Sequence, residues 1–157
     1  HMAYEWAQRV GDMRLLTWNN LDLDEQRLDL EQSKRRADVH LPISDALCKM
    51  LVQQHTDFGF QPYVAPRPEP YNGAYTSYHS TDIHKLVNEV KDSAGLPKEL
   101  TALDLRRTGI TEMVEAGVDT LGIMQVSGHS NPQSVKPYLV NTLKGASTAL
   151  NKRNNNK

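Results

Sequence analysis

Residues 103–138 read LDLRRTGITEMVEAGVDTLGIMQVSGHSNPQSVKPY, with an arginine pair, a Gly-His and a tyrosine nine residues after that histidine. The first part has helical periodicity, and the face it predicts carries Leu103, Arg106, Ile110 and Met113. This pattern places the guanidinium of Arg106 within an apolar stripe. A buried charge is unfavourable unless it is paired, so a salt bridge in the core is the simplest interpretation of a single arginine of this kind.

The same pattern occurs near the beginning of the chain. There an arginine again interrupts an apolar stripe, formed by Trp6, Arg9, Met13 and Leu16. Two planar guanidiniums held on rigid helices are suited to bidentate binding of a tetrahedral anion such as phosphate. The repetition therefore favours an anion site over two unrelated salt bridges.

Together these residues resemble the tyrosine recombinases, also called the phage integrase family, over about residues 8–142. The segment QRVGD (8–12) is similar to the first arginine box of that family, and EQSK (31–34) to its hairpin lysine. The second box is usually His-x-x-Arg and looks like LDLR (103–106), with leucine where the family most often has histidine. Gly128-His129 and Tyr138 resemble the Gly-His and the nucleophilic tyrosine. A single arginine or a single Gly-His would be weak evidence for the family, whereas six matching positions in the family order make the resemblance specific.

The resemblance implies that the chain cuts and rejoins DNA through a covalent 3′-phosphotyrosyl intermediate, with neither metal nor other cofactor. Tyr138 would be the nucleophile. Arg9 and Arg106 would hold the non-bridging phosphate oxygens, and Lys34 would protonate the departing 5′-hydroxyl. His129 would either donate a hydrogen bond to the phosphate or take part in handling the tyrosine proton. The implied partners are double-stranded DNA, further copies of the chain in a synaptic tetramer, and accessory DNA-bending or directionality proteins.

Most of these residues also have simpler interpretations. Lys34 begins the run Lys-Arg-Arg, which alone would indicate a solvated turn, and Tyr138 alone would indicate a half-buried aromatic. Asp12 lies three residues after Arg9 and is expected to orient that arginine rather than to carry a proton. His79, Asp82 and His84 match no standard zinc spacing, so the start of a solvated helix is predicted there rather than a metal site.

Composition alone would not have indicated nucleic acid, because the 157 residues include 18 basic and 19 acidic side chains. Residues 1–100 carry 11 Lys and Arg against 15 Asp and Glu, whereas residues 101–157 carry 7 against 4. The near-neutral charge, with Leu103 in the second box, leaves open a DNA-binding module of the same fold with weak or no catalysis. A transposase or resolvase of the same family is the other alternative.

One α+β domain, mainly α-helical with a small three-stranded antiparallel sheet, is predicted for residues 3–150. Residues 1–2 resemble the remnant of a cleaved tag, the domain is expected to be truncated at its N-terminus, and the polar residues 151–157 to form a disordered tail. No run is apolar enough to span a membrane, and the single cysteine, Cys48, favours a reducing cytoplasm. The cytoplasm or nucleoid of a bacterial host is the expected location.

Periodicity and turn residues predict the individual elements. A long irregular loop is expected over 63–80, and Pro137 is expected to break the last helix near Lys136, leaving Tyr138 in a new segment. The predicted helices cover residues 4–16, 44–55, 82–94, 101–116, 119–126 and a segment from 131, and the predicted strands cover 21–23, 27–34 and 39–43.

Overall fold

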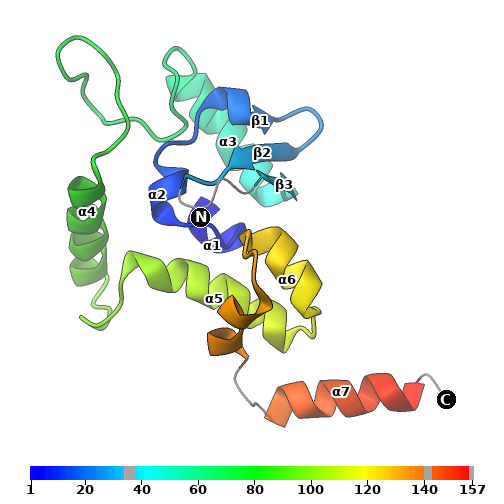
Figure 1. The fold of residues 1–157 in the computed structure, drawn as a ribbon. Helices are drawn as coiled ribbons and strands as arrows, with labels where there is room; N and C mark the ends of the chain where they lie inside the picture. The colour runs from blue at the N-terminus through cyan, green and yellow to red at the C-terminus, as the bar shows by residue number, and fades with distance from the viewer. Residues whose placement is uncertain (34–37, 140–142, 156–157) are drawn as a thin grey trace.

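The sheet is small and antiparallel, and it buries one face. The computed structural model describes residues 1–33, 38–139 and 143–155. Within the sheet, Leu28 pairs with Leu41 and Leu30 with Val39, and all four side chains are buried, as their alternation with polar residues predicts. The strand order is β1-β2-β3 (Figure 1), with β1 at Leu21–Asp22, β2 at Arg27–Glu31 and β3 at Asp38–Pro42.

Helices make up most of the rest, so the predicted mainly helical α+β fold is confirmed. Two of them begin with a side-chain cap: the Ser44 side chain accepts from the backbone N–H of Leu47, and the Asp119 side chain from that of Gly122. The α-helices are α1 (Met2–Glu5), α2 (Val10–Met13), α3 (Asp45–Phe58), α4 (Ser80–Ser93), α5 (Ala102–Glu115), α6 (Thr120–Ser127) and α7 (Leu143–Asn155). The described ranges also contain the 3₁₀ turns η1 (Trp18–Asn20), η2 (Pro132–Ser134) and η3 (Lys136–Tyr138).

The prediction of one helix over residues 4–16 is wrong, because the chain breaks between α1 and α2. Ala7 has a φ of 49°, a left-handed conformation that is unfavourable for alanine. The break lets two consecutive residues enter different cores: Trp6 packs beside the sheet, whereas Ala7 packs against α5 and α6. The periodicity of the sequence cannot show which of two cores a side chain enters. The break also places Arg9 at the N-cap of α2 instead of in the middle of a helix.

The two buried clusters meet at the segment that carries Arg9. The larger one lies between the sheet, α3 and the N-terminal segment, and the smaller one contains Ala7, Ile110, Ile123 and Val135. α1 and α5 approach closely at Gly109, where an added Cβ would lie 2.4 Å from the Tyr4 carbonyl oxygen. This close approach brings the helix that carries Arg106 against the segment that carries Arg9.

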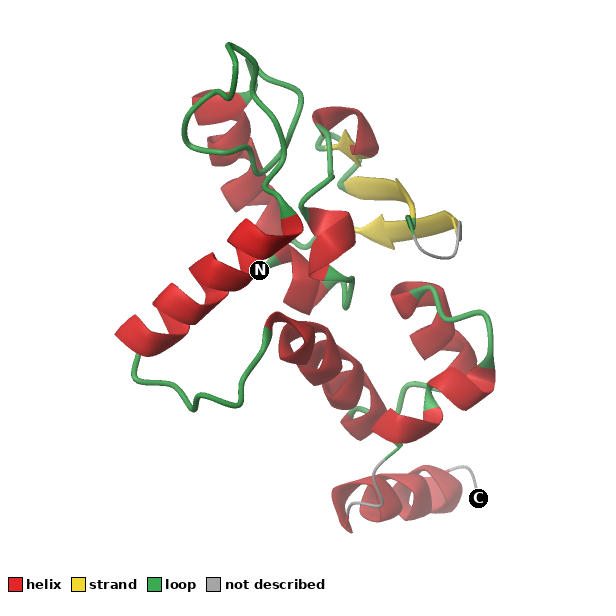
Figure 2. Ribbon diagram, turned by 60° about the vertical axis from the view of Figure 1, so that its left-hand side comes forward, coloured by secondary structure: helices red, strands yellow, loops and turns green. Residues whose placement is uncertain are grey.

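Two helices stand off from this body. α4 follows the irregular segment 59–79 and stands apart from the strands (Figure 2). α7 is helical through Asn155, which differs from the disordered tail predicted for 151–157. Lys152 accounts for part of this difference, since its Nζ donates to the Gly117 carbonyl oxygen at 3.0 Å and places a positive charge near the helix C-terminus. None of the helices described is both long and apolar enough for a membrane span.

Candidate functional site

Arg9 is held at the N-terminus of α2 by two side chains from different directions. Its Nη1 donates to Oε1 of Gln32 at 3.1 Å and lies 3.7 Å from Oδ2 of Asp12. Asp12 is buried, and its other carboxylate oxygen accepts from the backbone N–H and hydroxyl of Ser33. The prediction that Asp12 orients Arg9 is therefore confirmed, and the same carboxylate also anchors the chain just after β2.

Arg106 is only 3% exposed, and its Nη1 has no hydrogen-bond partner in the part of the chain that is described. Its Nη2 donates to the Ser127 carbonyl oxygen at 2.9 Å and to Nε2 of His129 at 3.2 Å. Burial is the main reason that the pKa of Arg106 falls to about 10, and the nearby charge of Arg9 lowers it further. The side chains of Tyr138 and Asp12 act in the opposite direction. Arg106 thus remains charged at neutral pH in a dry site that does not fully solvate it.

The hydrogen bonds around His129 define its tautomer. A guanidinium can only donate, so Nε2 of His129 accepts the bond from Arg106 and carries no proton. The proton is on Nδ1, which lies 2.7 Å from the Ser127 hydroxyl oxygen. That hydroxyl donates its own hydrogen to the Ile123 carbonyl oxygen at 2.6 Å and can therefore accept from Nδ1. In this arrangement Nε2 of His129 directs its lone pair at Arg106.

Tyr138 lies beside this histidine on the 3₁₀ turn η3. Its ring is 6.0 Å from the ring of His129, centroid to centroid, and is half-buried against the smaller core. The predicted break at Lys136 is observed as two successive 3₁₀ turns, η2 and η3, in place of a continuous helix. The structure therefore brings Arg9, Arg106, His129 and Tyr138 into one cluster.

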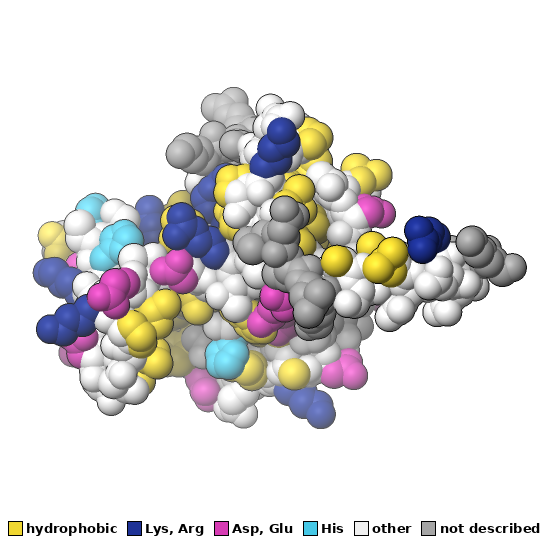
Figure 3. Space-filling model, turned by 90° about the horizontal axis from the view of Figure 1, so that it is seen from below, with side chains coloured by type: hydrophobic (Ala, Val, Ile, Leu, Met, Phe, Trp, Pro, Cys, Tyr) yellow, Lys and Arg dark blue, Asp and Glu magenta, His cyan; other side chains and the backbone are white. Residues whose placement is uncertain are grey.

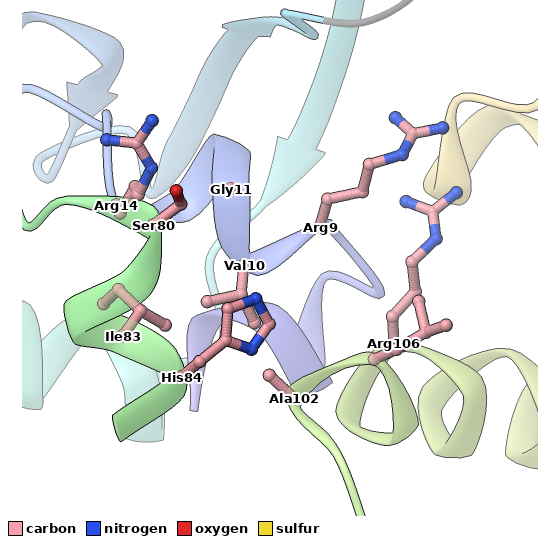
Figure 4. A pocket seen from close by; sticks show the side chains of 10 residues that line it. Arg9, Val10, Gly11, Arg14, Ser80, Ile83, His84, Ala102 and Arg106 are labelled. Carbon is pink, nitrogen blue, oxygen red and sulfur yellow. The ribbon is translucent and has the colours of Figure 1, made fainter. Parts of the chain in front are cut away.

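An open pocket adjoins the two arginines, whose guanidinium groups lie side by side in Figure 4. Leu103 lines this pocket one turn before Arg106, but it is 48% exposed. The prediction that it belongs to a buried stripe is wrong, because the buried face of α5 runs through Ala102, Arg106 and Ile110. The pocket is lined by Arg9, Val10, Gly11, Arg14, Ser80, Ile83, His84, Ala102, Leu103 and Arg106.

The structure does not bring every predicted residue to this cluster. Lys34 falls outside the described residues. His79 is the N-cap of α4, and Asp82 pairs with Arg67 at 3.5 Å, consistent with the solvated helix start predicted there. Within the described ranges, no cluster of His, Cys, Asp or Glu side chains could hold a metal ion.

Three polar residues of the cluster were not predicted from the sequence: Gln8, Gln32 and Ser127. All are fully buried, and each takes part in a hydrogen bond with a distant part of the chain. Gln8 donates to the Val126 carbonyl, and the Ser127 carbonyl accepts from Gln32 and Arg106. The sequence gives one indirect signal, since Gln8 and Gln32 lie inside the two segments that resemble family motifs. Their contacts depend on the tertiary fold and cannot be inferred from spacing.

Comparison with known proteins identifies this arrangement. The model of the phage integrase family matches residues 1–144. The chain belongs to the phage integrase family. A tyrosine recombinase from Pseudothermotoga lettingae is 23% identical over 139 residues, covering 88% of this chain and 46% of that protein. Tyrosine recombinase XerC from Pediococcus pentosaceus is 20% identical over 142 residues, covering 87% of this chain and 46% of that protein.

Solved structures show the same fold at low identity. XerA recombinase superposes with a TM-score of 0.75 at 19% identity, covering 97% of this chain and 54% of that one. The Tn1549 transposon integrase, in complex with transposon right end DNA, gives a TM-score of 0.77 at 14% identity, covering 96% and 56%. The chain thus spans about half the length of the relatives it matches.

Proposed function

We propose that this chain is the catalytic part of a site-specific DNA recombinase that cleaves and rejoins strands through Tyr138. The observation that carries the proposal is the buried Nη1 of Arg106, which meets no hydrogen-bond partner at bonding distance among the described residues and lies beside a second guanidinium and a tyrosine. Buried polar groups are nearly always hydrogen-bonded, so an orphan donor in a doubly cationic pocket indicates an anion that binds there. A phosphate diester supplies both the missing acceptor and the missing negative charge.

In the proposed reaction, the Tyr138 hydroxyl oxygen forms a bond to phosphorus, and the bond from phosphorus to the 5′-oxygen breaks. Negative charge accumulates on the non-bridging oxygens, where Arg9 and Arg106 stabilise it. The tyrosine proton needs an acceptor, and we assign that role to Nε2 of His129, which would release its hydrogen bond from Arg106 to take the proton. The 5′-hydroxyl leaves with a proton, which we assign to Lys34 from its place in the family motif.

Double-stranded DNA is the proposed partner, and two observations bear on how it is bound. The Tn1549 integrase was solved in complex with transposon right end DNA, and XerH site-specific recombinase was solved bound to its difH substrate. On the face seen in Figure 3, Lys and Arg side chains are interspersed with Asp and Glu rather than gathered in one basic patch. We therefore expect binding to depend on local clusters of cations at the site. A synaptic tetramer, accessory proteins and a location in the bacterial cytoplasm stay predictions.

A suicide duplex tests the proposal. A nick placed just after the cleavage site lets the short 5′-hydroxyl fragment diffuse away, so the covalent intermediate accumulates. The expected result is a protein–DNA adduct that survives denaturing electrophoresis. DNA binding without any adduct would instead establish the non-catalytic DNA-binding module of the same fold. The target site is obtained first by selecting bound sequences from a random duplex library.

Replacement of the hairpin lysine tests the proposed leaving-group acid. Lys34→Ala is expected to slow adduct formation on the order of a hundredfold or more, because general acid catalysis typically contributes that much. A 5′-phosphorothiolate leaves without needing a proton, so this substrate should restore most of the rate. Equally slow cleavage of both substrates would exclude Lys34 as the acid.

Leu103 offers a gain-of-function prediction. Leu103→His places a hydrogen-bond donor at the pocket wall one turn from Arg106, and a missing donor in such a site typically lowers the rate on the order of a hundredfold. We expect faster adduct formation in a single-turnover assay. Because Leu103 is 48% exposed, the melting temperature should hardly change. An unchanged or lower rate with an intact fold would mean that the site functions around leucine.

A further inference from the structure

Gln32 lies directly after β2 and is fully buried between the parts of the candidate site. Its Oε1 accepts from Nη1 of Arg9 at 3.1 Å. Its Nε2 donates to Oε1 of Gln8 at 2.5 Å and to the Ser127 carbonyl oxygen at 3.0 Å. The three groups come from the segment before α2 and from the end of α6, so one amide connects separate elements.

The orientation of this amide is determined by its partners. Arg9 can only donate, and the Ser127 carbonyl can only accept. The Gln8 amide nitrogen is already engaged with the carbonyl oxygens of Trp6 and Val126, which leaves its Oε1 facing Gln32. A reversed Gln32 amide would set oxygen against oxygen at two contacts and nitrogen against a guanidinium at the third. Only one orientation satisfies all of them.

The Ser127 carbonyl is shared between Gln32 and the second arginine, since it also accepts from Nη2 of Arg106. The Gln32 amide packs against Gly128, the residue that follows Ser127. A Cβ added to Gly128 would lie 2.4 Å from Nε2 of Gln32. Gly128 also has a φ of 68°, which ends α6 in a left-handed turn. The fold thus leaves a slot that the Gln32 side chain fills, between Arg9 and the carbonyl that holds Arg106.

Arg9 needs such a contact more than Arg106 does. Its side chain is 24% exposed, and the neighbouring guanidinium repels it. An arginine in that position gains solvation by turning outward when no anion is bound. The carboxylate of Asp12 lies at 3.7 Å, a longer contact than the 3.1 Å bond to Gln32.

We propose that Gln32 is a positioning residue that sets the spacing of the two phosphate-binding guanidiniums by tying Arg9 to the carbonyl that holds Arg106. This inference rests on the proposed recombinase function. Gln32 does not touch the reacting atoms and acts through Arg9. Its removal should leave the charges in place but loosen their arrangement before the substrate binds.

The test compares Gln32→Met with the wild-type chain on the suicide duplex. A misplacement of about 1 Å at a reacting group can lower the rate on the order of a hundredfold, so we expect a loss between about tenfold and a hundredfold. DNA affinity should change by less than about threefold, because the charges that attract DNA are kept. A substrate with a methyl group in place of one non-bridging oxygen develops less charge in the transition state. The defect should shrink on that substrate, which a purely structural role would not produce.

Gln61→Met is the matched control. Gln61 is also a buried, bonded glutamine, but it ties together the end of α3 through Phe58 and Tyr63. Gln61→Met should lower the melting temperature about as much as Gln32→Met does, but it should not slow cleavage. If Gln32→Met does not fold, Gln32→Asn takes its place, because it keeps the amide but is one methylene shorter. We expect the same pattern of effects for it, with a smaller loss of cleavage rate.

Several results would overturn the inference. A wild-type rate in folded Gln32→Met, an equal slowing in Gln61→Met, or a defect that is unchanged on the methyl-substituted substrate would each do so. Loss of the fold in Gln32→Asn would make Gln32 a folding residue instead. Failure of the wild-type chain to form an adduct would count against the proposed function, and so the two proposals fail in different ways.

Discussion

Tyr138→Phe is expected to abolish covalent attachment to DNA while leaving the fold unchanged. The substitution removes one hydroxyl from a half-buried ring that packs against the smaller buried cluster, so the apolar contacts are kept. No other atom at that position can form the phosphotyrosyl bond. Denaturing electrophoresis after incubation with the suicide duplex should show no adduct, and the melting temperature and DNA affinity should match those of the wild-type chain.

Tyr4→Phe is the control for this prediction. The Tyr4 hydroxyl donates to Oε2 of Glu112 at 2.6 Å on an exposed surface between α1 and α5. Its removal also deletes one tyrosine hydroxyl, yet the adduct should form at the wild-type rate. An adduct that persists in Tyr138→Phe, or disappears in Tyr4→Phe, would place the nucleophile on another residue.

The elements that sequence predicts well are those in which local chemistry and tertiary packing agree. Ser44 and Asp119 start helices as caps, and Gly95 and Gly117 follow helix ends with positive φ. The β2–β3 pair has alternating side chains with one buried face, and the structure adopts that register. In these cases a short stretch contains all the information that its conformation requires.

The elements that sequence predicts poorly are those decided by distant contacts. Residues 4–16 have helical periodicity, but Trp6 and Ala7 pack in different clusters and the helix breaks between them. Leu103 fits the stripe of Arg106 by spacing, yet the neighbours of α5 cover the adjacent face instead. Spacing shows which residues share a helix face but does not show which part of that face another element covers.

The candidate site divides in the same way. Arg9, Arg106, His129 and Tyr138 were found from residue types in a family order, and the structure places them together. Their environment was not predictable, because it consists of carbonyl oxygens and buried amides with no sequence signature. The pairing of Arg106 is the clearest example: the simplest expectation was a salt bridge, whereas its partners are a carbonyl and an imidazole.

Arg106→Met is expected to remove activity with little change in stability. A lowered pKa in a cation means that folding disfavours the charged form, and the fall of the Arg106 pKa from its ordinary value to about 10 corresponds to roughly 3 kcal/mol. Methionine removes that penalty and fills similar space. It also removes two hydrogen bonds from a charged donor, worth about 1.5 kcal/mol each, and the Ser127 carbonyl still accepts from Gln32. These effects nearly cancel, so the melting temperature should stay within a few degrees.

Cleavage should fall about a thousandfold or more, because the charge of Arg106 faces the phosphate in a dry site where its interaction is strongest. The pH dependence of stability supplies a second measurement. The penalty on wild-type Arg106 is complete below the folded pKa of about 10 and disappears as the pH rises from there towards the ordinary pKa of an arginine. The melting temperature of the wild-type chain should therefore rise relative to that of Arg106→Met between about pH 9 and pH 11. Groups common to both proteins cancel in this difference. A large loss of stability in Arg106→Met at neutral pH, or a difference that is flat with pH, would mean that Arg106 is fully compensated in the free protein and that no anion is needed to complete the site.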